Sequence, residues 1–353
     1  MDINSLLKKL IEHKAPDLHL KVGHPPFVRL VNGDLYPVDG LPNITKKDIM
    51  ELAKSIASTE KYERFEKDYE VDFSYGVEGI GRFRINLFFE KDGPALALRS
   101  IPSIIPTPEE LMLPTIVHTL AMKARGLILV TGPTGSGKST TLASMIDFVN
   151  ARRRCHILTI EDPIEFIFSS KKAFITQREV TYHTHSFADA IRSSLRQDPD
   201  IIMVGEMRDL ETIGTAMTLA ESGHLVLSTL HTSDAPQTIH RIIDVFPAEQ
   251  QQQIRTQLSL SLQAVISQTI LPRANGQGRI VAFEIMVVND AIRNLIKESN
   301  IHQIYSMIQI GRAEGMYTLD DSLARLCKAG VITEDMAFSK SHDPDLLRIA
   351  LRT

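Results

Sequence analysis

The stretch "GLILVTGPTGSGKSTTL", residues 126–142, decides the fold class of this 353-residue chain. It opens with an apolar run typical of a buried strand, and the apolar residues after Lys138 recur at helical spacing. Between the two, Gly132, Gly137, Lys138 and Ser139 satisfy the pattern G-x-x-x-x-G-K-[ST]. A glycine-rich turn in this context predicts a loop that holds the phosphates of a nucleotide.

The chemistry of phosphate binding gives each residue type in the loop a role. Glycines let backbone N–H groups converge on phosphate oxygens at the positive end of a helix, and Lys138 reaches the β- and γ-phosphates. The hydroxyl of Ser139 is suited to coordinate Mg²⁺, so we expect ATP and Mg²⁺ as ligands. The residues expected to bind the nucleotide are Gly132, Pro133, Thr134, Gly135, Ser136, Gly137, Lys138, Ser139 and Thr140.

The pattern after this loop predicts an α/β fold. Short apolar strands alternate with amphipathic helices as far as "LVLSTL", residues 225–230. All-apolar strands between helices are typical of a parallel sheet covered on both faces. Helices dominate from Pro247 onward, interrupted by a hairpin around residues 273–285.

The first hundred residues have a different, α+β pattern. Residues 3–13 place their apolar side chains, including Ile11, on one helical stripe, and residues 17–22 alternate as a half-buried strand does. Asn32-Gly33 and Asp92-Gly93 predict the turns of two hairpins. A proline-rich stretch over residues 101–114 marks a connector. We therefore expect an N-terminal domain with its linker over residues 1–110 and a nucleotide-binding domain over residues 111–353.

The second predicted hairpin presents arginines on one surface. On the first strand of the hairpin, Arg82 and Arg84 alternate with apolar residues such as Ile85. On the second strand, Arg99 points to the face opposite that of Leu98. Because alternate residues of a strand point to opposite faces, these arginines are expected to face solvent.

Hydrolysis of a nucleotide needs a carboxylate that positions and activates water. Glu206 follows the apolar strand 201–204, which we expect to lie beside the strand of the phosphate loop, and we assign Glu206 as the general base. The position where many such enzymes carry a Mg²⁺-binding aspartate is Gly205 here. One carboxylate therefore cannot simply be assigned both roles.

Further polar residues follow two other strands. Glu161, Asp162 and Glu165 come after an apolar strand and are expected to reach the same crevice, with a solvated acidic turn as the alternative. His231 follows the strand 225–230, where an imidazole could sense the γ-phosphate or be structural. His183 and the histidine two residues later have H-x-H spacing, but a solvated loop is favoured over a metal site.

The composition limits the classes of function. A net charge of −4 and a pI near 6.3 give no electrostatic reason for binding nucleic acid or an anionic membrane. The sequence contains neither a signal-peptide pattern nor a run of about 18 apolar residues. Cys155 and Cys327 fit a reducing compartment, so a cytoplasmic protein that meets membranes only through partners is expected.

Four motifs follow one another along the second predicted domain: "GPTGSGKST" (132–140), "TIEDPIE" (159–165), "DPDIIMVGEMRD" (198–209) and "HLVLSTLHT" (224–232). They closely resemble the Walker A, Asp box, Walker B and His box of the secretion-superfamily ATPases that power type II secretion and type IV pili. Within that superfamily the chain resembles the pilus retraction ATPases along nearly its whole length. Its "DAIRNLIKE" segment, residues 290–298, is similar to a stretch that those proteins use for retraction.

The resemblance implies more than the motifs alone. It implies a PAS-like N-terminal domain, a RecA-like ATPase domain with a helical C-terminal region, and a homohexamer with ATP between neighbouring subunits. Arg84 and Arg99 match the arginine sensors of the family, while Glu165 and His231 would complete the site around Glu206. The implied partner is a platform protein of the bacterial inner membrane, with a paralogous retraction ATPase as a further possible partner.

Other functions stay open at this point. The chain could be an accessory paralogue that joins a retraction ring and hydrolyses little ATP, or a related secretion ATPase. The absence of a tetracysteine zinc module argues against a pilus extension motor. A nucleic-acid translocase would need a basic channel, which the acidic pI disfavours, and nothing between the motifs suggests the acceptor pocket and lid of a small-molecule kinase.

Overall fold

The computed structural model describes residues 2–13, 15–30, 34–102 and 104–352. The chain forms two compact units. The first comprises Met1–Ile104 together with Glu165–Ile167, and the second comprises Ile105–Ile164 and Phe168–Thr353. The α/β fold class expected from the sequence, an α+β unit followed by a phosphate-loop unit, is confirmed.

The first unit is a six-stranded antiparallel sheet with three helices. Its elements are α1 (Ile3–Glu12), β1 (Asp17–Lys21), β2 (Phe27–Arg29), β3 (Leu35–Pro37), α2 (Lys46–Ile56), α3 (Thr59–Asp68), β4 (Glu70–Val77), β5 (Gly81–Glu90) and β6 (Gly93–Ile101). The strands lie in the order β3-β2-β1-β6-β5-β4. Apolar side chains of α1 and α2 pack with the alternate apolar residues of β1, β5 and β6 in one core.

The sequence predicted most of this unit. The helix and strand at its start are present, and both hairpins pair as expected. The prediction that Ile11 lies on the buried stripe is wrong, since Ile11 is 46% exposed while the other apolar residues of α1 are buried. The turn Asn32-Gly33 lies outside the described residues. The second turn is one residue earlier than predicted, because Gly93 already pairs with Glu90.

The second unit contains a seven-stranded sheet and helices on both of its faces. Its elements are α4 (Thr115–Ala121), β7 (Gly126–Thr131), α5 (Lys138–Asn150), β8 (His156–Glu161), β9 (Phe174–Glu179), α6 (Phe187–Ser194), β10 (Ile201–Val204), α7 (Leu210–Glu221), β11 (Leu225–Leu230), α8 (Ala235–Asp244), α9 (Gln251–Ser261), β12 (Leu262–Pro272), β13 (Arg279–Val287), α10 (Asp290–Lys297), η1 (Ile301–Gln303), α11 (Ile304–Ile310), η2 (Gly311–Glu314), α12 (Leu319–Lys328), α13 (Glu334–Lys340) and α14 (Pro344–Arg352).

The order of the strands corrects one sequence-based expectation. The sheet runs β13-β12-β7-β11-β10-β8-β9, and only the β12–β13 pair is antiparallel. Strand β10, which precedes Glu206, was expected beside the phosphate-loop strand β7, and this expectation is wrong. Strand β11 pairs with both β7 and β10 and so separates them. The order of the strands along the chain does not fix their order in the sheet, because each helical crossover can place the next strand on either side of the preceding strand.

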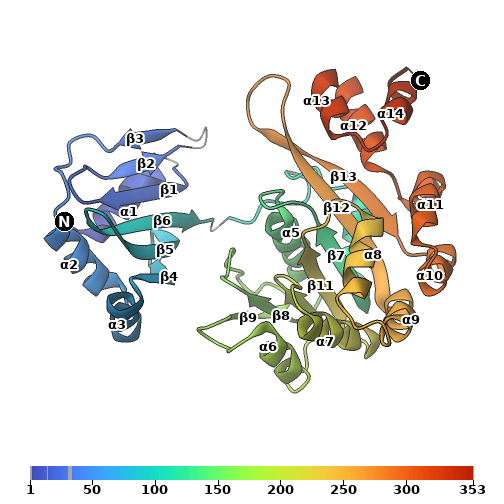
Figure 1. The fold of residues 1–353 in the computed structure, drawn as a ribbon, viewed down its shortest axis with the longest axis horizontal. Coiled ribbons are helices and arrows are strands. Elements are labelled where there is room, and N and C mark those ends of the chain that lie inside the picture. Colours follow the sequence, from blue (N-terminus) through green and yellow to red (C-terminus); the bar gives the residue numbers. More distant parts are fainter. Residues whose placement is uncertain (1, 14, 31–33, 103, 353) are drawn as a thin grey trace. The chain divides into compact units, whose positions relative to one another are not determined.

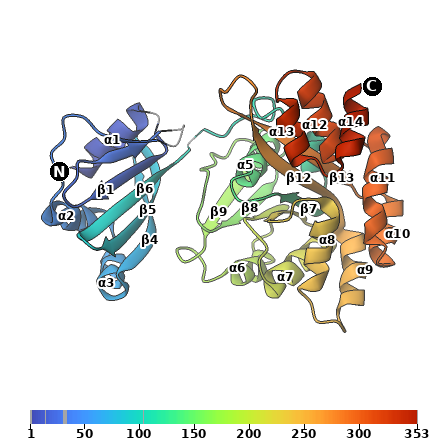
Figure 2. The same ribbon diagram turned by 45° about the horizontal axis from the view of Figure 1, so that its top comes forward.

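The helices divide between the two faces. Leu127 and Leu129 of β7 share a core with apolar residues of α6 to α11. Strand geometry turns Ile128 and Val130 to the opposite face, where α5 contacts β7 and packs with α4. The three helices α12, α13 and α14 form a separate small core with the end of the β12–β13 hairpin (Figures 1 and 2). No helix in the described part of the chain combines the length and apolar composition needed to span a bilayer.

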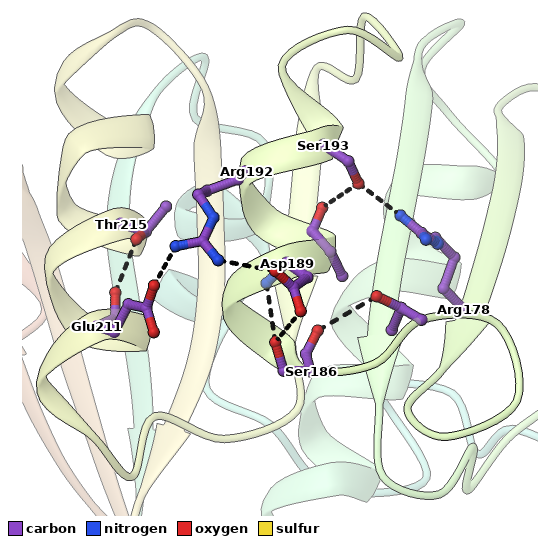
Figure 3. Close-up of polar contacts among 9 residues, drawn as sticks. Arg178, Ser186, Asp189, Arg192, Ser193, Glu211 and Thr215 are labelled. Carbon is purple, nitrogen blue, oxygen red and sulfur yellow. Dashed lines mark hydrogen bonds and ion pairs between the residues drawn. The ribbon is translucent and has the colours of Figure 1, made fainter.

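A polar network ties α6 to its neighbours on the surface (Figure 3). Arg192 of α6 forms ion pairs with Asp189 on its own helix and with Glu211 at the start of α7. Arg178 of β9 donates a 2.8 Å hydrogen bond to Ser193 on the same helix. The network links α6 to the edge strand β9 on one side and to α7 on the other.

Glu284 is among the most deeply buried carboxyl groups of the second unit. Glu284 on β13 is 1% exposed and accepts a 2.9 Å hydrogen bond from the backbone N–H of Ala235 at the start of α8. Its other oxygen has no hydrogen-bond partner among the described residues. Burial raises the pKa of Glu284 from 4.5 to about 7, because the charged form loses its hydration.

This raised pKa predicts that stability depends on pH. Between pH 4.5 and 7 the unfolded state releases the proton while the folded state keeps it, so the free energy of unfolding falls as pH rises. The fall attributable to this group between pH 5 and pH 8 is roughly 2 to 3 kcal/mol. In Glu284→Gln, which keeps the acceptor for Ala235, urea unfolding at the two pH values should lack this component. An unchanged pH dependence would contradict the assignment.

Candidate active site at the phosphate loop

Glycines allow the loop between β7 and α5 to pass close to the neighbouring strand. Gly132 has φ +143°, and a Cβ there would lie 2.3 Å from the backbone oxygen of Gln268 on β12. Gly137 has φ +89° at the N-terminus of α5. Side chains at these positions would meet backbone atoms or adopt strained dihedral angles, so the loop geometry requires the glycines of the motif.

The lysine of the loop is turned onto the loop itself. Nζ of Lys138 donates hydrogen bonds to the backbone oxygens of Gly132, at 2.9 Å, and Pro133, at 3.1 Å. The Oγ of Ser136 is buried, and no described residue gives it a hydrogen-bond partner. A buried cationic amine at the loop and an unsatisfied hydroxyl fit a phosphate group, whose oxygens would accept hydrogen bonds from both.

Gln268 is a residue that sequence reasoning missed. Its Nε2 donates to the backbone oxygen of Ser136 at 2.5 Å, and its Oε1 accepts from the hydroxyl of Thr141 on α5 at 3.0 Å. This buried amide therefore ties the loop and the following helix to β12. The signal in the sequence was the polar run Ser267–Thr269 flanked by apolar residues of the strand, because a buried amide needs hydrogen-bond partners.

The remaining loop residues differ in exposure. Pro133, Thr134 and Gly135 are exposed at the tip, whereas Ser139 and Thr140 are half-buried in the first turn of α5. The structure thus brings the predicted nucleotide-binding residues together as one loop and helix terminus. Their individual roles, including Ser139 as ligand for Mg²⁺, stay predictions.

The expected general base is held by two neighbours. Glu206 follows β10, and its side chain is 14% exposed. Its Oε1 lies 2.6 Å from Nη2 of Arg208, and its Oε2 lies 3.5 Å from Nε2 of His231. The structure therefore brings Glu206 and His231 together, as expected from the sequence, and adds Arg208 as a cation beside the carboxylate.

His231 links the base to the phosphate loop. Its Nδ1 lies 3.4 Å from Nζ of Lys138. An ammonium group has only hydrogens to offer, so a neutral ring that binds it through Nδ1 would carry its proton on Nε2, facing Glu206. His231 reaches both groups because β11 lies between β7 and β10, so the corrected strand order is the reason for this contact.

Gly205 is packed too tightly to be replaced by an aspartate without adjustment. A Cβ at this position would lie 3.3 Å from the backbone oxygen of Ile160 and 3.5 Å from Cα of Glu161 on β8. Glu161 itself is buried and accepts hydrogen bonds from Thr159, at 2.7 Å, and Gln177, at 3.2 Å. A solvated acidic turn therefore does not describe Glu161.

The other two acids of this segment are exposed. Asp162 follows β8 directly, and Glu165 belongs to the first compact unit. A role for Glu165 at the phosphates stays a prediction.

His183 has a structural role in its loop. Its Nδ1 accepts a 2.9 Å hydrogen bond from the backbone N–H of Glu179. The backbone N–H of His183 donates a 2.8 Å hydrogen bond to the backbone oxygen of Glu179. His185 lies in the same loop and is exposed. In the described ranges, no three His, Cys, Asp or Glu side chains cluster as metal ligands would.

The arginines of the first unit occupy the face of the sheet opposite its core. Arg84 on β5 pairs directly with Arg99 on β6, and both side chains are more than half exposed. Arg99 binds Asp17 through Nε, at 2.7 Å, and Nη2, at 3.3 Å. Arg84 lies 3.9 Å from Asp72. Arg84 and Arg99 therefore face solvent as expected, whereas Arg82 is half-buried.

A phosphate loop between a buried parallel strand and a helix, with a histidine after the adjacent strand β11 and a carboxylate after the next strand β10, defines the class of P-loop ATPases. Comparisons with known proteins narrow the class. The family described as "Type II/IV secretion system protein" matches residues 109–277.

Relatives of the chain are similar over almost its whole length. The type IV pilus retraction ATPase PilT of Pseudomonas aeruginosa is 49% identical over 98% of this chain and 99% of its own. A twitching motility protein of Neisseria gonorrhoeae is 48% identical over 91% of this chain and 85% of its own. A crystal structure of the pilus retraction motor PilT with bound ADP has a TM-score of 0.93, covers 99% of both chains and shares 49% identity. The chain belongs to the PilT family of pilus retraction ATPases, and its second unit is a nucleotide-binding ATPase unit.

The close approach at Gly132 gives a test of the loop. In Gly132→Ala the new methyl group meets the backbone of Gln268, so the loop must shift and nucleotide affinity should fall about tenfold or more, with the fold retained. Gly276→Ala is the matched control, because Gly276 has φ +71° but no atom within 4 Å of the added Cβ. Fluorescent ATP titration measures both. Equal affinities in the two variants would show that the approach at Gly132 is not needed.

Proposed function

We propose that the chain is the motor subunit of a homohexameric ATPase that hydrolyses ATP to drive type IV pilus retraction. The observation that carries this proposal is similarity to PilT over 98% of the chain, combined with an intact phosphate loop beside Glu206. Membrane contact would be made through a platform protein of the inner membrane, with the motor on the cytoplasmic side.

The residues of the second unit account for binding and hydrolysis in the proposal. Backbone N–H groups of the loop and the N-terminus of α5 hold the β- and γ-phosphates, and Lys138 exchanges its loop carbonyls for phosphate oxygens. Mg²⁺ bound at Ser139 would neutralise phosphate charge. Glu206 accepts the proton of the attacking water, and Nε2 of His231 orients the Glu206 carboxylate.

Binding of ATP would also change the contacts of His231. When Lys138 turns to the phosphates, Nδ1 of His231 loses the ammonium group that lies 3.4 Å away and becomes available as an acceptor for another donor. The base would thereby be linked to the presence of the γ-phosphate, with Glu165 completing the site. This link supports a cycle in which nucleotide state alters protein conformation.

Arginines from another copy would complete the site. Arg84 and Arg99 are exposed on the first unit, where their guanidinium groups could reach a phosphate bound elsewhere. An arginine that contacts the γ-phosphate of ATP but not ADP would couple hydrolysis to movement between units. The runner-up function is an accessory paralogue with low hydrolysis. The arrangement of Lys138, His231 and Glu206 favours the hydrolytic motor over it.

A subunit-mixing experiment tests the shared site. Glu206→Gln should bind ATP but turn it over about 100-fold or more slowly, because it removes the base, and Arg84→Ala should also lower turnover. In rings mixed from equal amounts of the two variants, about a quarter of the interfaces would combine an intact Glu206 with an intact Arg84. Turnover should then exceed the mean of the two pure variants. A mixture that equals this mean would place the whole site in one copy.

A second experiment separates hydrolysis from pilus retraction. Arg293 lies on α10 in the segment that resembles the family's retraction stretch, and its side chain is 35% exposed. Arg293→Ala should leave ATP turnover within about twofold, because α10 is not part of the phosphate site, yet abolish pilus retraction in a piliated strain that lacks its own retraction ATPase. Lys340→Ala, which removes an exposed cation from α13, is the control. Retraction that survives the Arg293 change would refute this role.

A further inference from the structure

One row of charged residues crosses the sheet of the first unit. Directly paired positions on adjacent antiparallel strands point to the same face. In order across β4, β5, β6, β1 and β2, the row consists of Ser74, Arg84, Arg99, Asp17 and Arg29. Three of its five members are arginines and one is a carboxylate. The row borders a groove of about 300 Å³ on this face.

Asp17 is the buried member of the row. Its side chain is 10% exposed, whereas that of Arg99 is 70% exposed. Nε of Arg29 lies 3.9 Å from Oδ2 of Asp17, on the side away from Arg99. One carboxylate thus lies between two guanidinium groups. The row keeps a net positive charge, and the buried carboxylate of Asp17 fixes the position of the Arg99 side chain.

The geometry of the Asp17–Arg99 pair leaves part of the guanidinium available. A guanidinium carries five N–H donors in a rigid plane. Asp17 takes one from Nε and one from Nη2, which is the side edge of the group. The outer edge, formed by Nη1 and the second hydrogen of Nη2, has the spacing that suits two oxygens of a phosphoryl group. Within the described residues the outer N–H groups donate no hydrogen bond, and besides Asp17 the carboxylate of Glu165 attracts Arg99 electrostatically.

We propose that Asp17 is a positioning residue that fixes the guanidinium of Arg99, so that its outer edge receives the terminal phosphoryl group of ATP held by another copy of the chain. The proposal rests on the proposed function, which supplies the phosphate. Holding the guanidinium in advance matters because a flexible arginine must lose side-chain freedom each time it binds, and a misplaced one stabilises developing charge poorly. The hydrogen bond to Asp17 also raises the pKa of Arg99.

Asp17→Asn tests this role, because the amide keeps the size of the side chain but lacks the second acceptor oxygen and the charge. The value of kcat should fall about tenfold, while affinity for ATP at the phosphate loop changes less than about twofold. Glu78→Gln, on the exposed loop between β4 and β5, is the control for loss of a carboxylate from the same unit. An Asp17→Asn protein that melts like the parent and keeps its kcat would overturn the proposal.

A double-mutant cycle separates positioning from a general structural effect. In an Arg99→Ala background, Asp17→Asn should cause no further loss of kcat, because there is no guanidinium left to position. A loss of similar size in both backgrounds would show that Asp17 acts independently of Arg99 and would overturn the proposal. If Arg99→Ala itself leaves turnover unchanged, the arginine role in the proposed function fails instead.

A third variant leaves Asp17 intact and so avoids any cost to folding from its replacement. In Arg99→Lys the charge is retained, but an ammonium group has no second planar edge, so a lysine bound by Asp17 cannot also present a fork to phosphate. Its kcat should be close to that of Arg99→Ala. Turnover restored by lysine to the parent value would show that charge alone suffices and that the orientation set by Asp17 is not needed.

Discussion

The second unit depends on the close approach of the phosphate loop to strand β12. Gly132 lets the loop backbone pass against Gln268, and the amide of Gln268 then binds the loop at Ser136 and α5 at Thr141. Loop, helix terminus and sheet are thereby fixed as one rigid arrangement. Backbone N–H groups can serve as an anion site only when they are held in place before the ligand arrives, so this packing is the basis of the site.

Charge in the site is arranged as a chain of alternating partners. Lys138 faces Nδ1 of His231, Nε2 of His231 faces Glu206, and Arg208 binds the other oxygen of that carboxylate. A change at either end therefore alters the surroundings of the next group. In the proposed function, an arriving phosphate would compete for Lys138 at one end and so connect occupancy of the loop to the expected general base.

In the first unit, a buried carboxylate compensates the charge of neighbouring arginines. Arginines placed directly opposite each other on antiparallel strands repel, as Arg84 and Arg99 do in the β5–β6 pair. Asp17 offsets this repulsion from the next strand and leaves one edge of Arg99 exposed. The sheet therefore carries exposed arginines on one face, and the opposite face of the same strands, with Ile85 and Leu98, forms the core.

The sequence by itself determined what depends on neighbours along the chain: the strand, turn and helix of the phosphate loop, the helix and hairpins of the first unit, and the arginines in phase on one face. Local periodicity and the dihedral freedom of glycine fix these features. Only the tertiary structure decided that β11 lies between β7 and β10, which brings His231 to both Lys138 and Glu206. It also decided that Gln268 holds the loop and Asp17 holds Arg99, 82 positions away. Pairings between distant segments are set by packing in the whole sheet, and no pattern in a short window of sequence encodes them.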